Sequence, residues 1–72
     1  MSELVDHIRV VLADGSNRTA TEVLAGLRSR GLWPRDTDPL GRVRYELAAN
    51  RKTFERVVGE RGSYRLVRRS GG

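Results

Sequence analysis

Along the first thirteen residues, apolar side chains recur with the three- and four-residue spacing of one face of an α-helix. The positions that form this face are Leu4, Val5, Ile8, Val11 and Leu12. We expect a helix from about Ser2, whose hydroxyl can cap it, to Ala13, because Gly15 accepts the left-handed conformation that ends helices. The single histidine, His7, lies at the edge of this face, where a boundary residue is expected rather than a catalyst.

A second helical pattern follows a polar link at residues 16–18, which is compatible with a strand of two or three residues. Thr19 and Glu22 have the spacing of a capping box, in which each side chain bonds the other residue's backbone amide. The predicted helix ends before Gly31, and Gly26 weakens it unless it allows close helix packing. Its expected inward positions are Val23, Leu24 and Leu27.

A third helix is predicted from Pro39 to about Asn50, after a hydrophobic turn at Leu32-Trp33-Pro34. Thr37 or Asp38 is the expected cap, since proline is favoured at the first helical position. The predicted apolar side consists of Leu40, Val43 and Leu47; Arg44 and Glu46 flank it; the outer face consists of Gly41, Arg42, Tyr45 and Ala49.

The pattern then changes to the two-residue period of strands, over residues 54–58 and 63–67, around a glycine-containing turn at residues 59–62. Phe54 and one of the two valines that follow, Val57 or Val58, are expected to face the core. In the second strand, Tyr64 and Leu66 alternate with polar positions and are the inward candidates. These features predict a β-hairpin.

Length and composition narrow the classes of function. A chain of 72 residues has room for one domain and none for a deep cleft between lobes. It contains no cysteine and one histidine, which excludes a disulfide framework and most zinc sites. The longest apolar run, residues 10–13, is too short for a transmembrane helix or a signal-peptide core. We expect a protein that is not secreted: cytoplasmic and nucleoid-associated, or nuclear in a eukaryote, with no membrane partner.

The excess of basic over acidic residues is confined to the second half of the chain. The formal net charge is +5; residues 1–40 carry five arginines and six acidic residues, and residues 41–72 carry nine basic and three acidic residues. The formal net charge is therefore −1 for residues 1–40 and +6 for residues 41–72. One-sided basicity is typical of proteins that bind polyanions. No enzyme is expected, because no nucleophile has an adjacent base and the acidic pair Asp36 and Asp38 suits helix capping better than metal binding.

Three helices followed by a β-hairpin in an α+β chain is the winged helix-turn-helix arrangement, predicted over residues 1–67, with residues 68–72 as a tail or linker. Several short motifs also resemble the HARE-type winged helix-turn-helix domain family over about residues 3–67. They are Gly31-Leu32-Trp33, Asp38-Pro39, Phe54 and Gly62-Ser63-Tyr64-Arg65-Leu66. The resemblance implies a DNA-binding accessory module of a transcription regulator or a larger parent protein, with no cofactor and no small-molecule substrate.

The predicted partner is double-stranded DNA, with the third helix in the major groove and the hairpin on the backbone or minor groove. Arg42 is the candidate for a guanine contact, with pairing to Glu46 four residues on as its alternative. The complete set of predicted DNA-binding residues is Thr37, Arg42, Arg44, Tyr45, Arg51, Lys52, Arg61 and Arg65. The alternative is a protein-interaction winged helix that docks on polymerase, a nuclease subunit or another regulator.

Overall fold

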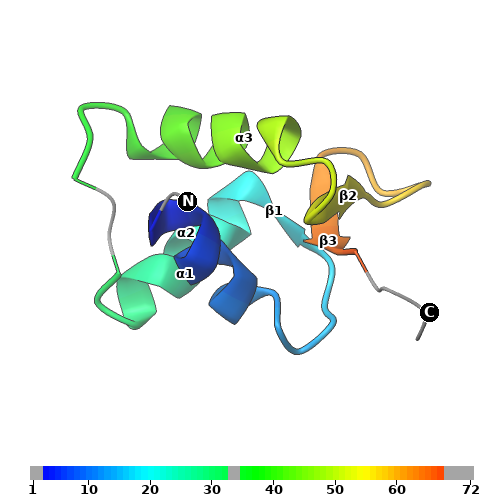
Figure 1. Ribbon diagram of the computed structural model, residues 1–72, viewed down its shortest axis with the longest axis horizontal. Helices are drawn as coiled ribbons and strands as arrows, with labels where there is room; N and C mark the ends of the chain where they lie inside the picture. Colours follow the sequence, from blue (N-terminus) through cyan, green and yellow to red (C-terminus); the bar gives the residue numbers. More distant parts are fainter. Residues whose placement is uncertain (1–2, 33–34, 68–72) are drawn as a thin grey trace.

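The computed structural model describes residues 3–32 and 35–67, which form three helices and three short strands. The helices are α1 (Glu3–Val11), α2 (Ala20–Ser29) and α3 (Pro39–Ala49); the strands are β1 (Arg18–Thr19), β2 (Phe54–Arg56) and β3 (Ser63–Leu66). Figure 1 shows α3 lying across the α1–α2 pair, with the sheet beyond the end of α3. The predicted Ser2 cap, Trp33 and Pro34 of the hydrophobic turn, and the tail at 68–72 lie outside the described residues.

Local hydrogen bonds define the start of α2 and the link before it. The capping box is confirmed: the Glu22 amide donates to Thr19 Oγ1 over 3.2 Å, and the Thr19 amide donates to Glu22 Oε1 over 2.8 Å.

Gly26 is confirmed as a close-packing position, because a Cβ atom there would lie 2.8 Å from Cγ1 of Val11 in α1. The two helices can therefore approach more closely than an alanine would allow.

The core joins all three helices to the first residue of the hairpin. The apolar side chains that are buried in it are Val5, Ile8, Val11, Leu12, Ala20, Val23, Leu27, Val43, Leu47 and Phe54. Leu24 and Leu40, both predicted to point inward, are partly buried against this cluster, as are Tyr64 and Leu66 of β3. The hydrophobic periodicity thus identified nearly all of the core.

Helix α3 begins at a side-chain cap. Of the two candidates, Asp38 is the cap: its Oδ1 accepts from the Gly41 amide over 3.0 Å, and Pro39 occupies the first helical position. The helix ends one residue before the predicted Asn50, which acts as the C-terminal cap and donates from Nδ2 to the Glu46 carbonyl oxygen. Glu46 was predicted to flank the apolar stripe, but only 6% of the residue is exposed, so it belongs to the buried side.

The three strands form an antiparallel sheet in the order β1–β3–β2. The short strand expected near residues 16–18 is present at Arg18–Thr19, where it pairs with β3. The prediction that one of the valines faces the core is wrong, because β2 ends at Arg56 and the hairpin extends past the core. Val57 is half-buried outside the core cluster, and Val58 is 98% exposed.

This α+β arrangement is the predicted one: three helices, then a hairpin that projects as a wing, with β1 added to its edge. Within residues 3–32 and 35–67, no helix combines the length and the apolar character needed to cross a bilayer.

Candidate nucleic-acid interface

The outer face of α3 points to solvent, because Val43, Glu46 and Leu47 on its other side are buried. Tyr45 is 64% exposed and stands out from this face. The other exposed residues of the helix are Arg42, Arg44, Ala48 and Ala49. The predicted outward orientation is confirmed for Arg42, Tyr45 and Ala49. The exposed side of α3 therefore combines two arginines and a tyrosine with the short side chains of Ala48 and Ala49.

Gly41, the remaining predicted outer-face residue, is half-buried and has a local structural role. The Asp38 carboxylate occupies the space that a Cβ atom at Gly41 would need. Glycine at this position therefore accommodates the capping side chain.

Arg42 pairs with Glu46, as its alternative interpretation foresaw. Arg42 Nη2 lies 3.9 Å from Glu46 Oε2, and the two side chains are 46% and 7% exposed. A buried carboxylate is costly without a compensating charge, so a move of Arg42 onto a guanine would leave Glu46 unpaired. Among the basic residues of α3, Arg42 is the less available one for a partner, and Arg44 is the more available.

The start of α3, where Thr37 was predicted to contact a phosphate, is surrounded by acidic groups. Asp36 Oδ1 accepts from the Asp38 amide over 3.2 Å and from Thr37 Oγ1 over 3.4 Å. The Asp38 carboxylate accepts a hydrogen bond from the Gly41 amide. The two carboxylates already accept hydrogen bonds from the donors that a phosphate would use, and their negative charge would repel a phosphate. The start of α3 is therefore the least favourable of the predicted phosphate positions. Within the described ranges, no group of three or more metal-ligating side chains is present.

Four of the predicted contacts are exposed cations without partners. They are Arg44, Arg51, Lys52 and Arg61. None of their side chains forms a hydrogen bond or ion pair with another residue in the part of the chain that the structure describes. They lie on α3, in the turn that follows it and at the wing tip, so the structure brings them to the same half of the molecule.

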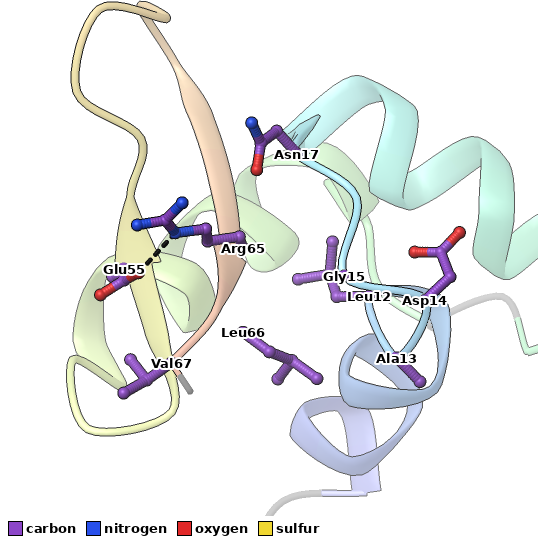
Figure 2. Close-up of a pocket in the computed structure, with 9 residues that line it drawn as sticks. All are labelled: Leu12, Ala13, Asp14, Gly15, Asn17, Glu55, Arg65, Leu66 and Val67. Atoms are coloured by element: carbon purple, nitrogen blue, oxygen red, sulfur yellow. Dashed lines mark hydrogen bonds and ion pairs between the residues drawn. The ribbon is translucent and has the colours of Figure 1, made fainter. Parts of the chain in front are cut away.

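The remaining predicted wing contact, Arg65, lies on the face of the hairpin opposite Phe54. The register pairs Arg65 with Glu55 across the two strands, and Arg65 Nε lies 2.5 Å from Glu55 Oε2. Figure 2 shows the ion pair between Glu55 and Arg65, while the Leu66 side chain extends away from it toward α1. Arg65 is therefore engaged within the wing. It also lines the pocket drawn in Figure 2, which lies between the hairpin and the segment that follows α1.

Arg56 is a basic residue of the wing that was not among the predicted contacts. It lies directly opposite Tyr64 in the sheet, two residues from Phe54 and so on the same face as that core residue. Arg56 and Tyr64 line a hollow together with Ala48 and Ala49 of α3. The alternation of side chains from Phe54 was the signal that could have found Arg56, because residues 54 and 56 of a strand must share a face.

The fold and surface define a class: a small α+β domain of winged-helix layout. Its exposed cations without a side-chain partner include Arg44, Arg51, Lys52 and Arg61, on the last helix, in the turn after it and in the wing, and also Arg9 on α1. Comparison of the chain with protein-family models, with curated proteins and with solved structures finds no match.

Proposed function

We propose that this protein is a double-stranded DNA-binding module that inserts α3 into the major groove and places the β2–β3 wing on the backbone or in the minor groove. The observation that carries the proposal is the set of unpartnered cations Arg44, Arg51, Lys52 and Arg61 on α3 and the wing. Free cations gathered on one part of a surface are what a polyphosphate backbone neutralises. The proposal includes membership of the HARE-type winged helix-turn-helix family, for which the support is the set of short motifs alone.

In this arrangement the cations position the domain, and Tyr45 makes the central groove contact. Arg44 extends from α3, and Arg61 lies at the wing tip, so the two are suited to phosphates on either side of the inserted helix. Tyr45 projects from the outer face of α3 and can reach a phosphate or a thymine methyl group. Because Arg42 compensates buried Glu46, we give it a supporting role in place of the guanine contact.

The second candidate function is docking on a protein, and the exposed apolar side chains favour it. Val58 at the wing is 98% exposed and Tyr45 is 64% exposed. Large exposed apolar side chains are typical of protein interfaces when they form one patch. Here they are separate and lie among cations, which is why DNA is the preferred partner.

The decisive experiment is a fluorescence-anisotropy titration of a labelled duplex over roughly 50 to 200 mM salt. If six phosphates are contacted, the logarithm of the association constant should fall with the logarithm of salt with a slope of about −5. A slope shallower than about −2 contradicts the backbone contacts. Absence of binding at low salt contradicts the proposal and favours the protein-docking function.

A pair of charge-matched variants tests the location of the contacts. Arg44→Gln/Arg61→Gln should reduce the magnitude of the slope by about 2, because two phosphate contacts are lost. Arg30→Gln/Arg35→Gln removes the same charge from exposed positions before α3 and should leave the slope nearly unchanged. Equal effects of the two variants would mean that net charge, and not this surface, drives binding.

A further inference from the structure

An open hollow of about 640 Å³ lies between the end of α3 and the wing. The side chains that line it are Leu47, Ala48, Ala49, Arg51, Phe54, Glu55, Arg56 and Tyr64. Leu47 and Phe54 are 1% and 2% exposed and therefore belong to the rigid core. Ala48 and Ala49 are exposed and short, so they leave the approach from the outer face of α3 open.

Arg56 and Tyr64 lie side by side in this hollow. The strands β2 and β3 pair them directly, Arg56 with Tyr64, on the same sheet face as the Phe54–Leu66 pair. Facing pairs on adjacent strands have Cβ atoms only about 5 Å apart. The guanidinium of Arg56 and the hydroxyl of half-buried Tyr64 are thus donors on the same face of the sheet. Arg51, from the turn after α3, adds a second guanidinium to the same lining.

The cations of the hollow are uncompensated. The acidic residue among those that line it is Glu55, and its carboxylate is paired with Arg65 on the hairpin face opposite Arg56 and Tyr64. Arg51 and Arg56 are exposed and have no side-chain partner within residues 3–32 and 35–67. Two guanidinium groups that border one hollow repel each other, and an anion between them would relieve this repulsion.

We propose that this hollow is a phosphate-binding site that holds one phosphodiester of the DNA backbone between α3 and the wing. Arg51 and Arg56 supply the charge, and the Tyr64 hydroxyl donates a further hydrogen bond. A phosphate held there fixes how the wing is placed relative to the helix in the groove. The inference rests on the proposed function, and it assigns a site and two residues, Arg56 and Tyr64, beyond the predicted contacts.

The test compares Arg56→Gln with the charge-matched Arg30→Gln, in duplex titrations at several salt concentrations. Arg56→Gln should weaken binding about tenfold at low salt and reduce the magnitude of the salt slope by about one. Arg30→Gln should do neither, since Arg30 is exposed at the end of α2. Tyr64→Phe should weaken binding a few-fold with an unchanged slope, because it removes a neutral donor and no charge. Amide NMR spectra establish that each variant is folded.

A second titration, with inorganic phosphate alone, separates this site from the proposed function. Amide shifts at Arg51, Arg56 and Tyr64 are expected, and Arg56→Gln should abolish them. If the duplex binds but Arg56→Gln behaves as Arg30→Gln, the hollow is not a phosphodiester site while the DNA-binding function stands. If the duplex does not bind but phosphate shifts these amides, the hollow takes free phosphate and the DNA proposal fails. If neither ligand acts there, the phosphate site is overturned.

Discussion

The two halves of this molecule use their polar side chains differently. In the half formed by α1, β1 and α2, they bond to their own neighbourhood: Thr19 with Glu22, Ser16 with Asp14, and the Arg30 guanidinium with the Gly26 carbonyl oxygen. In the half formed by α3 and the wing, Arg42 and Arg65 pair with carboxylates, but the other exposed cations have no side-chain partner among the described residues. Among the described residues, unpaired cations are therefore concentrated in the second half, whereas in the first half Arg9 is exposed and unpaired. Substitutions in the first should therefore change stability, and those in the second should change binding.

The largest expected effect is on the stability of the first half. Leu27 in α2 is 0% exposed, and Leu27→Ala should lower the free energy of unfolding by about 2–5 kcal/mol, through lost burial and the cavity left behind. Urea denaturation measures it, with exposed Arg44→Gln as the control, expected within about 0.5 kcal/mol of the wild type. If Arg44→Gln destabilises the protein as much as Leu27→Ala, it is wrong to separate a first half that stabilises the fold from a second half that binds.

The local features of both halves could be predicted from the sequence because they depend on near neighbours. Apolar periodicity placed the helices, and the spacing of Thr19 and Glu22 gave a capping box that the structure contains. The proline at position 39 predicted the start of α3, which begins at Pro39. Each of these signals is completed within one or two helical turns, so no tertiary information was needed.

The faces of the elements in the second half were harder to predict, since they depend on how the hairpin meets α3. Glu46 has the sequence context of a flanking residue, yet it is buried against the core with Arg42 as its partner. The doubled valine made the hairpin register ambiguous, and neither valine is in the core. Arg65 was among the predicted contacts and Arg56 was not, and the cross-strand pairing places the two on opposite faces of the hairpin.

A smaller effect is expected at Tyr45, where a substitution should weaken duplex binding and leave stability unchanged. Because the residue is 64% exposed, Tyr45→Ala should change the free energy of unfolding by less than about 0.5 kcal/mol. It should weaken duplex binding about fivefold, or about 1 kcal/mol, if the ring meets the groove as proposed. Tyr45→Phe separates the two contacts: retained affinity indicates a thymine methyl group, and lost affinity indicates a phosphate. If Tyr45→Ala lowers the free energy of unfolding by more than it weakens the free energy of duplex binding, Tyr45 stabilises the fold and is not part of the binding surface.

The smallest expected effect sharpens the description of the first half. The side-chain hydrogen bond from Ser16, together with the Ser16 amide and Arg18, lowers the pKa of Asp14 below its ordinary value of 3.8. Because the folded-state pKa is the lower one, the stabilisation from this carboxylate is complete above about pH 3.8 and is lost as pH falls through the folded value. A carboxyl NMR titration measures this pKa, and Ser16→Ala should raise it toward 3.8.

Ser16→Ala should also leave duplex affinity and the salt slope unchanged, because the charge of the α3–wing surface is untouched. A measured Asp14 pKa at or above 3.8 would show that these hydrogen bonds do not favour the charged form. A changed salt slope would be the more serious result. It would mean that the link before β1 contributes to the binding surface, so that the local bonding of the first half and the free charge of the second are not separate properties.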